Sequence, residues 1–408
     1  MDQDTSEAFT MRSGASWRDP FDMYANLRDH HPVHHVVPPD APADDYWVLT
    51  RHADVMAAAT DWETFSSARG LTVTYGELKA IGLADNPPIV MQDPPQHTDF
   101  RRLVARGFTP RQVTTLEPLV RAFVVDRIED LRARGGGDVA VELFKPLPSM
   151  VVAHYLGVPE DDRRRFDAWT EAIVGANPGA DLGAAMATAS DAVLELTAYF
   201  AELIERRRAE PGDDTVSHLV AAGVADDPRT DPAGLLSILA FAFTMVAGGN
   251  DTTTGMLGGS AELLTVHRDQ RRILLDDPAV MSDAVEELLR LTSPVQGLAR
   301  TTTRDVEVDG VTIPADRKVL LCYGSANRDE REYGPAAGTL DVRRRPRNIL
   351  TFSHGAHHCL GAAAARLQAR VALEELLARC PNFEVDVDGI EWAEGNYVRR
   401  PTSIPCML

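Results

Sequence analysis

The sequence has few cysteines, and none of the spacings that cysteines take in disulfide-rich or zinc-finger domains. The four in this chain of 408 residues are Cys322, Cys359, Cys380 and Cys406, and no two form a C-x-x-C pair. So sparse a set excludes a disulfide scaffold and favours a reducing, cytoplasmic location. A single cysteine can still carry chemistry.

Signals for secretion or membrane insertion are also missing. The first residues, MDQDTSEAFT, place acids where a signal peptide needs positive charge, and no apolar stretch follows them. The most apolar run, 235–247, has 13 residues, fewer than the roughly 20 that a helix needs to cross a bilayer. We therefore expect a core helix here and no membrane anchor.

Positive charge is scarce. The chain has 41 Lys and Arg against 61 Asp and Glu, a formal net charge of -20. This balance disfavours a protein that binds nucleic acid or anionic membranes through its general charge. Any cationic surface must be local.

Linkers, low-complexity tracts and internal repeats are absent too, so we expect one large domain over residues 16–408 behind a flexible N-terminal segment, 1–15. Apolar residues recur at helical spacing in several long segments. Strand patterns are fewer and shorter, which predicts small sheets. The predicted helices include 115–134, 192–208 and 363–380, and the predicted strands include 46–50, 305–311 and 318–323. The fold class is mainly α with minor β.

Cys359 lies in a glycine-bearing loop, Phe-Ser-His-Gly-Ala-His-His-Cys-Leu-Gly, that leads into a predicted helix. A thiolate at a helix N-terminus is favoured by the helix dipole, and glycines allow a flat ligand to approach closely. The three histidines beside it leave zinc open as an alternative, although no second ligand pair follows at finger spacing. An isolated cysteine would more simply be a buried core residue.

Two further patterns have simple structural explanations when read alone. Gly248 and Gly249 interrupt the apolar helix just before Asp251 and Thr252, at a cost of about 1 kcal/mol each relative to alanine. Close packing against another helix would explain them. Glu287 and Arg290 are three residues apart, the spacing of an ordinary surface salt bridge.

The ten residues from Phe352 to Gly361 closely resemble the haem-binding signature of the cytochrome P-450 superfamily, Phe-x-x-Gly-x-His-x-Cys-x-Gly. By this resemblance Cys359 is the proximal ligand of the iron of haem b, and its sulfur donates electron density that favours O–O cleavage. Phe352 and Gly361 then lie beside the cofactor. The sequence departs from common bacterial forms at Ser353, often Gly, and at Ile349, often His.

The resemblance also assigns roles to the other patterns. The Gly248 segment is similar to the family's distal helix, in which the small residue makes room for oxygen and the acid–alcohol pair, Asp251 and Thr252, relays protons. Glu287 and Arg290, with Arg344 downstream, match a structural Glu-x-x-Arg triad. Four basic residues match contacts of the haem propionates, which suit guanidinium and imidazole groups. These are His97, Arg101, Arg300 and His357.

The likeness runs from Pro20 to the region of Trp392, nearly the whole chain. It is strongest to the bacterial P-450 family numbered one hundred and thirty, in Thr292 to Arg300 and Gly355 to Arg366. It implies a triangular, mostly α single domain that encloses haem between the distal helix and the helix after Cys359.

The implied activity is monooxygenation of a hydrophobic small organic molecule, by hydroxylation or dealkylation, with inhibition by azoles. Two electrons would come from NAD(P)H through a ferredoxin reductase and a ferredoxin docked near Arg343 and Arg347. A peroxygenase using hydrogen peroxide and a non-catalytic haem sensor remain alternatives, and neither needs the Asp251–Thr252 pair. By family position, the substrate-pocket candidates are Leu71, Val73, Met91, Phe243, Val246, Val295, Leu298 and Val398.

Overall fold

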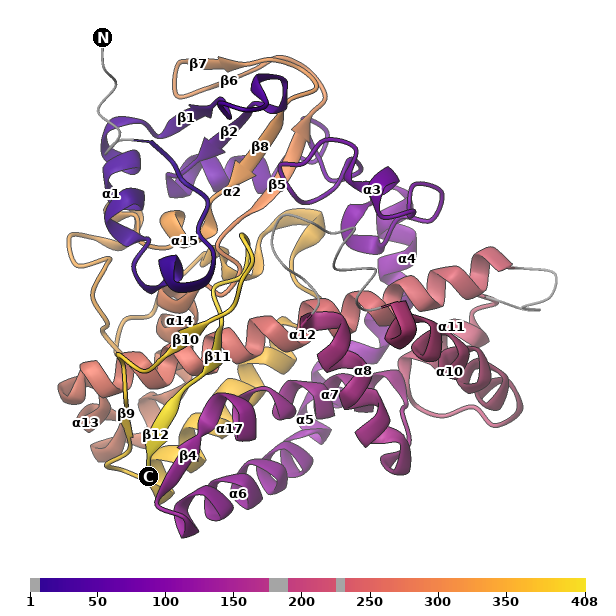
Figure 1. Ribbon diagram of the computed structural model, residues 1–408, viewed down its shortest axis with the longest axis vertical. Coiled ribbons are helices and arrows are strands. Elements are labelled where there is room, and N and C mark those ends of the chain that lie inside the picture. The colour runs from indigo at the N-terminus through magenta and orange to yellow at the C-terminus, as the bar shows by residue number, and fades with distance from the viewer. Residues whose placement is uncertain (1–7, 176–189, 225–231) are drawn as a thin grey trace.

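Helices dominate the computed structural model, which describes residues 8–175, 190–224 and 232–408 (Figure 1). The longest, α12, crosses the middle of the molecule. The α-helices are α1 (Phe21–His30), α2 (His52–Thr60), α3 (Glu77–Ala80), α4 (Gln96–Val104), α5 (Pro110–Thr115), α6 (Glu117–Ala133), α7 (Pro146–Leu156), α8 (Arg163–Gly175), α10 (Ser190–Ala209), α11 (Thr215–Ala221), α12 (Pro232–Val266), α13 (Arg268–Asp276), α14 (Met281–Thr292), α15 (Tyr323–Ala326), α16 (Glu330–Tyr333) and α17 (Ala362–Arg379).

Short 3-10 or π turns link several of these helices. They are η2 (Gly14–Arg18), η3 (Pro42–Asp44), η4 (Ile89–Met91), η5 (Ala105–Phe108), η6 (Ala140–Phe144), η7 (Glu160–Asp162), η8 (Pro278–Val280), η9 (Leu350–Phe352) and η10 (Gly355–His357). The turns η9 and η10 form the loop that leads to Cys359, so this loop has regular local structure.

The strands form small sheets at the margin of the helical body, as expected (Figure 1). One sheet has the order β1-β2-β8-β5-β3, and the smaller ones are β4-β12-β9, β10-β11 and β6-β7. The strands are β1 (Val33–Val36), β2 (Tyr46–Leu49), β3 (Phe65–Ser66), β4 (Gly136–Asp138), β5 (Leu298–Thr302), β6 (Val306–Val308), β7 (Val311–Ile313), β8 (Lys318–Leu321), β9 (Glu384–Val385), β10 (Glu391–Trp392), β11 (Pro401–Ser403) and β12 (Pro405–Met407).

Most predicted elements appear with bounds shifted by one or two residues, and one of them divides. The predicted helix 115–134 is α6, which begins at Glu117 because Pro118 in its first turn has no N–H to continue the earlier helix α5. The predicted strand 305–311 is the hairpin of β6 and β7, which turns at Asp309 and Gly310 with φ of 49° and 76°. Asp-Gly suits this turn because both positions need a positive φ.

Helix α12 extends well beyond the 13-residue apolar run. Its segment Gly234–Val266 is long and apolar enough to cross a membrane by length and composition. In the fold it instead packs against α7, α8, α14 and α17 in the interior (Figure 1). The continuous apolar character of α12 therefore reflects burial on several sides, as in other core helices.

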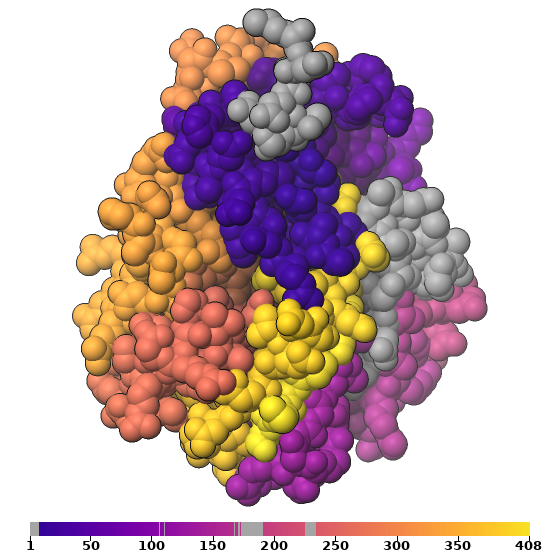
Figure 2. Space-filling model, turned by 60° about the vertical axis from the view of Figure 1, so that its left-hand side comes forward, coloured from indigo at the N-terminus to yellow at the C-terminus, as the bar shows by residue number. Residues whose placement is uncertain are grey.

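The N-terminal segment of the described chain packs against part of the C-terminal region (Figure 2). Phe9 is buried, the N–H of Gly14 donates to the carbonyl of Ala393 at 3.1 Å, and Trp17 Nε1 donates to Gly395 at 2.7 Å. Residues 8–15 thus pack on the body, although the sequence predicted a flexible segment through residue 15. Residues 1–7 of that segment lie outside the described residues.

Candidate functional site

The Cys359 loop is held in shape by its own backbone. The N–H of Cys359 donates to the carbonyl of Phe352 at 2.9 Å, which closes the loop before α17 begins. A Cβ on Gly355 would lie 3.0 Å from the carbonyl of Ala59, so glycine allows the loop to pack on α2. Ser353 has a φ of 53°, a conformation that glycine adopts most easily, which explains why related loops often carry glycine there.

Cys359 is exposed as a residue, while the other three cysteines are buried. Its thiol nevertheless lies deep among protein atoms, and this desolvation raises its pKa. The backbone N–H of Gly361 and the guanidiniums of Arg101 and Arg366 act in the opposite direction and favour the thiolate. Surface that is accessible yet surrounded by protein belongs to the wall of a hollow.

A second exposed patch interrupts the buried part of α12. Ala247 and Gly248 are exposed between Val246 and Asn250, which are buried, and a Cβ on Gly248 would meet nothing within 4 Å. Gly249 has a different function, since a Cβ there would lie 2.9 Å from Val152 on α7. One glycine therefore leaves open space and the other permits close helix packing.

Asp251 and Thr252 follow in the next turn of α12. Thr252 Oγ1 donates to the carbonyl of Gly248 at 2.8 Å, so the hydroxyl is held near the open face of the helix. Asp251 Oδ2 lies 2.8 Å from Arg400 Nε. Burial raises the pKa of Asp251 to about 6, against the opposing charges of Arg400 and Lys145. An acid with such a pKa exchanges protons readily near neutral pH.

Basic side chains from distant segments meet at one edge of this region. The rings of His97 and His357 are 4.3 Å apart, and Arg300 and Arg101 lie close enough to disfavour a charge on His357. Burial first, and then these neighbours, lower the pKa of His357 to about 3. Arg101 Nη2 also donates to the carbonyl of His358 at 2.5 Å. The structure thus brings together all four residues that the sequence predicted at the propionates.

These basic residues are incompletely satisfied by the protein. His97 Nδ1 and His357 Nε2 are buried, and neither has a hydrogen-bond partner among the described residues. Buried polar atoms without partners are costly, so the site is suited to an anionic group that accepts hydrogen bonds. Together with the exposed residue Cys359 and the open space beside Gly248, this donor set fits a haem with its propionates.

The zinc alternative gains no support from the geometry. Within residues 8–175, 190–224 and 232–408, no three His, Cys, Asp or Glu side chains are grouped so as to hold a metal ion. A structural zinc site needs four such ligands. A metal ion bound at Cys359 would therefore need ligands other than the described side chains, such as the porphyrin of a haem.

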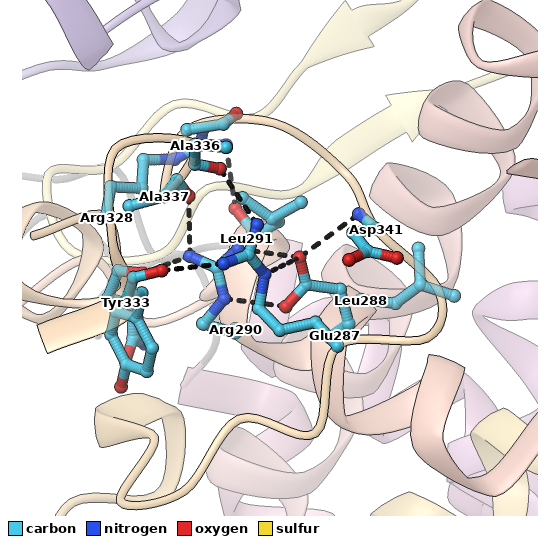
Figure 3. A network of polar contacts seen from close by, with 12 residues as sticks. Glu287, Leu288, Arg290, Leu291, Arg328, Tyr333, Ala336, Ala337 and Asp341 are labelled. Carbon is cyan, nitrogen blue, oxygen red and sulfur yellow. Dashed lines mark hydrogen bonds and ion pairs between the residues drawn. The ribbon is translucent and has the colours of Figure 1, made fainter. Parts of the chain in front are cut away.

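Glu287 and Arg290 form a buried pair (Figure 3), which the half-buried Arg344 joins. Arg290 donates twice to Glu287 at 2.7 Å, and Arg344 Nε donates to the same carboxylate at 3.1 Å. Arg290 also donates to the carbonyls of Asn327 and Ala337, at 2.6 and 2.7 Å. These bonds fasten α14 to the loop around residue 340, so the pair is no surface salt bridge.

Most of the substrate-pocket candidates are half-buried, as pocket walls should be. Val295 pairs with Val398 in an isolated β-bridge, and the carbonyl of Leu71 accepts from Ala299 N at 2.7 Å, next to Leu298. Val246 differs from the other candidates in that it has no exposed surface and packs in the hydrophobic cluster beneath α12. The residue that α12 exposes there is Ala247, one position along the helix.

A separate cavity of about 230 Å³ lies between the segment 85–92, α4 and the first half of α12. Ile89, Phe100 and Phe241 give it an apolar wall, and Gln92 and Ser237 add polar groups. None of the predicted pocket residues lines it.

Two residues of this site were missed by sequence reasoning. Arg400 pairs with Asp251 but lies in a C-terminal segment without a motif. Arg366 favours the Cys359 thiolate, its guanidinium lies 4.5 Å from the centre of the Phe352 ring, and it forms an ion pair with Glu286. The only sequence signal for a role of Arg366 was its position, one turn into α17 and on the side of the cysteine loop.

Comparison with known proteins agrees with this geometry. A model of the cytochrome P450 family matches residues 260–391. Cytochrome P450 130 of Mycobacterium tuberculosis is 69% identical over 402 residues, 98% of each chain. The vitamin D(3) 25-hydroxylase of Pseudonocardia autotrophica is 36% identical over 406 residues, 99% of this chain and 97% of the other.

Solved structures extend the similarity to three dimensions. A Mycobacterium marinum cytochrome P450 in complex with pseudoionone has a TM-score of 0.82 and 32% identity over 95% of this chain and 94% of its own. Family membership implies a haem cofactor and monooxygenase activity, and the Cys359 loop and the open face of α12 are where this fold would use them. The chain therefore belongs to the cytochrome P450 family and is a monooxygenase of that family.

Proposed function

We propose that the chain is a haem-thiolate monooxygenase in which Cys359 binds the iron and a hydrophobic small molecule is hydroxylated or dealkylated. The observation that carries the proposal is Cys359 itself, the one exposed cysteine, with the Gly361 N–H and two guanidiniums favouring its thiolate form. The other three cysteines are buried.

Four basic residues would hold the cofactor by its carboxylates. His97 Nδ1 and His357 Nε2 lack protein partners and would donate to the propionates, with Arg101 and Arg300 supplying charge. Phe352, Gly248 and Gly361 would lie against the flat group. When bound, a thiolate-ligated haem supplies the activation of dioxygen and the transfer of one oxygen atom to substrate.

Proton delivery is the chain's own contribution to the chemistry. Asp251 has a pKa of about 6 and can take up and release protons near neutral pH. The hydroxyl of Thr252 donates its one hydrogen to Gly248 and can accept a hydrogen bond from water; on rotating away from Gly248 it would donate to water instead. We therefore assign Asp251 to proton supply from solvent and Thr252 to the last transfer at the open face of α12.

The substrate is proposed to be apolar and of moderate size. Val295, Leu298 and Val398 converge through the bridge and strand contacts described above, with Leu71, Val73, Met91 and Phe243 as further wall residues. The named relatives include a vitamin D(3) hydroxylase and an enzyme solved with pseudoionone. Such walls discriminate by size and shape more than by hydrogen bonding.

Electrons would reach the site from NAD(P)H through a ferredoxin reductase and a ferredoxin, in the cytoplasm. Arg343 and Arg347 are exposed, and neither forms an ion pair with a described residue, whereas Arg345 pairs with Asp283. On a chain of net charge -20, two such cations are suited to an acidic partner.

The reduced carbon monoxide spectrum tests the proposal. The wild-type chain should show the red-shifted Soret band of a thiolate-ligated haem, and Cys359→Ser should lose it. Cys380→Ser and Cys406→Ser are matched controls and should keep it. An unchanged band in Cys359→Ser would refute the assignment.

Turnover assays then separate the alternatives, and azole titration gives an independent measure of access to the iron. Product formation with NAD(P)H, ferredoxin and reductase supports the monooxygenase. Product formation with hydrogen peroxide alone would indicate a peroxygenase, and ligand binding without product in either assay would indicate a sensor.

A further inference from the structure

Asp251 is paired with a residue from the far end of the chain. Arg400 Nε lies 2.8 Å from Asp251 Oδ2, and the two side chains are only 13% and 16% exposed. Water screens such a pair less than it screens a surface salt bridge, so the interaction is strong enough to determine where the carboxylate lies.

A glycine face on α12 allows Arg400 to come this close. Gly255 and Gly258 follow Asp251 at four and seven residues, on the same side of the helix. A Cβ on Gly255 would lie 2.7 Å from the carbonyl of Arg399, and one on Gly258 would lie 2.5 Å from Pro401 Cγ. Larger residues would push the C-terminal segment away from α12 and separate the pair.

The backbone around Arg400 is fixed on the other side as well. The carbonyl of Arg400 accepts from Ala393 N at 3.0 Å, and the N–H of Arg399 donates to Pro294 at 2.8 Å. Arg399 Nε donates to the carbonyl of Trp17 at 2.7 Å. The guanidinium of Arg400 therefore projects from a segment anchored to three parts of the fold.

The charges around Asp251 come from two elements of the described structure. Arg400 approaches from the C-terminal segment, and Lys145 from the junction of η6 and α7. Both favour the ionised carboxyl, against the burial that raises its pKa to about 6. Without Arg400 the burial would be less opposed, and the carboxyl would hold its proton to a higher pH.

We propose that Arg400 is a positioning residue for proton delivery, which fixes the Asp251 carboxylate beside Thr252 and keeps it able to release its proton. The inference rests on the proposed role of Asp251. It adds a residue to the relay that acts only through Asp251 and touches neither substrate nor cofactor.

The test compares Arg400→Gln, Arg400→Lys, Asp251→Asn and the double variant Arg400→Gln/Asp251→Asn, all as haem-loaded enzymes. The first readout is the infrared absorption of the protonated carboxyl, identified by its absence in Asp251→Asn. In Arg400→Gln this signal should titrate roughly one pH unit or more higher than in wild type, because an opposite charge within hydrogen-bonding distance has been removed. Arg400→Lys should restore most of the shift.

The second readout is the pH profile of NAD(P)H-driven oxygen consumption with ferredoxin and reductase. Arg400→Gln should move the profile in the same direction while leaving haem content and azole affinity unchanged. In the Asp251→Asn background, Arg400→Gln should have no further effect. An unshifted titration in Arg400→Gln, or equal effects with and without Asp251, would overturn the inference.

A different result would overturn the proposed relay itself. If Asp251→Asn consumes oxygen with the wild-type rate and pH profile, Asp251 delivers no protons. If Asp251→Asn slows turnover but Arg400→Gln does not alter the titration, only the role of Arg400 fails. Loss of haem in Arg400→Lys as well as in Arg400→Gln would show that Arg400 is merely structural.

Discussion

Arg290 and Glu287 meet through two hydrogen bonds of 2.7 Å at a place where neither side chain has any exposed surface. Removing one partner of such a pair leaves a buried charge without compensation, which costs far more than the pair itself contributes. The pair therefore matters for folding and not for the reaction.

Glu287→Ala should destabilise the protein by about 3–5 kcal/mol and reduce the yield of haem-loaded enzyme. Asp283→Ala is the matched control on the same helix, because its partner Arg345 is 81% exposed and the pair should contribute about 1 kcal/mol or less. Denaturant unfolding followed by circular dichroism measures both. Similar losses in the two variants would contradict the assignment.

Thr252→Ala should keep the haem, the carbonyl spectrum and NAD(P)H oxidation, but release hydrogen peroxide in place of product. The reason is that the hydroxyl that completes proton transfer is lost while electron supply is not. Ser260→Ala is the control, because it removes the same kind of bond on α12, from Ser260 Oγ to Met256 at 2.7 Å, away from the site. Product formed per NAD(P)H oxidised is the measurement, and full coupling in Thr252→Ala would remove this residue from the mechanism.

Gly248→Ala and Gly249→Ala should change the stability of the protein in opposite directions. At Gly248 the new Cβ meets open space, so the better helix propensity of alanine should stabilise the apoprotein by up to about 1 kcal/mol. At Gly249 the Cβ would lie 2.9 Å from Val152, so the packing must shift and stability should fall.

The same two variants distinguish an effect on stability from an effect on ligand binding. Gly248→Ala should weaken azole or carbon monoxide binding despite its stability, because the open space is needed for ligands, whereas Gly249→Ala should alter both together. Urea midpoints and ligand titrations on the same samples check this. Unchanged ligand affinity in Gly248→Ala and in the larger Gly248→Leu would refute the role of this opening.

Reversing the charge of Arg343 or Arg347 should slow reduction by the ferredoxin and reduce the dependence of its rate on ionic strength. Neither residue is tied to a described carboxylate, so the effect would report the partner protein. Lys79→Glu changes an exposed cation on α3 by the same amount and serves as the control. Equal rates across a salt series in all three variants would exclude this docking surface.

The candidate site could be proposed from the sequence because the resemblance that indicates it rests on local patterns. The loop from Phe352 to Gly361 combines a cysteine, glycines and a helix start within ten residues, and Asp251 and Thr252 adjoin the glycines of an apolar helix. Periodicity likewise predicted most helices and the small sheets, since apolar spacing reports the buried face of an element directly.

Tertiary structure decided what depends on contacts between distant segments. The amino-acid pattern alone could not indicate that Val246 faces the core, because a rotation of about 100° per residue separates it from exposed Ala247. Nor could it pair Arg400 with Asp251. Arg400 Nε lies 2.8 Å from Asp251 Oδ2, although Asp251 belongs to α12 and Arg400 to the C-terminal segment. The sequence determined which chemical groups this protein has, and packing determined which of them meet, because burial and partners are properties of the whole fold.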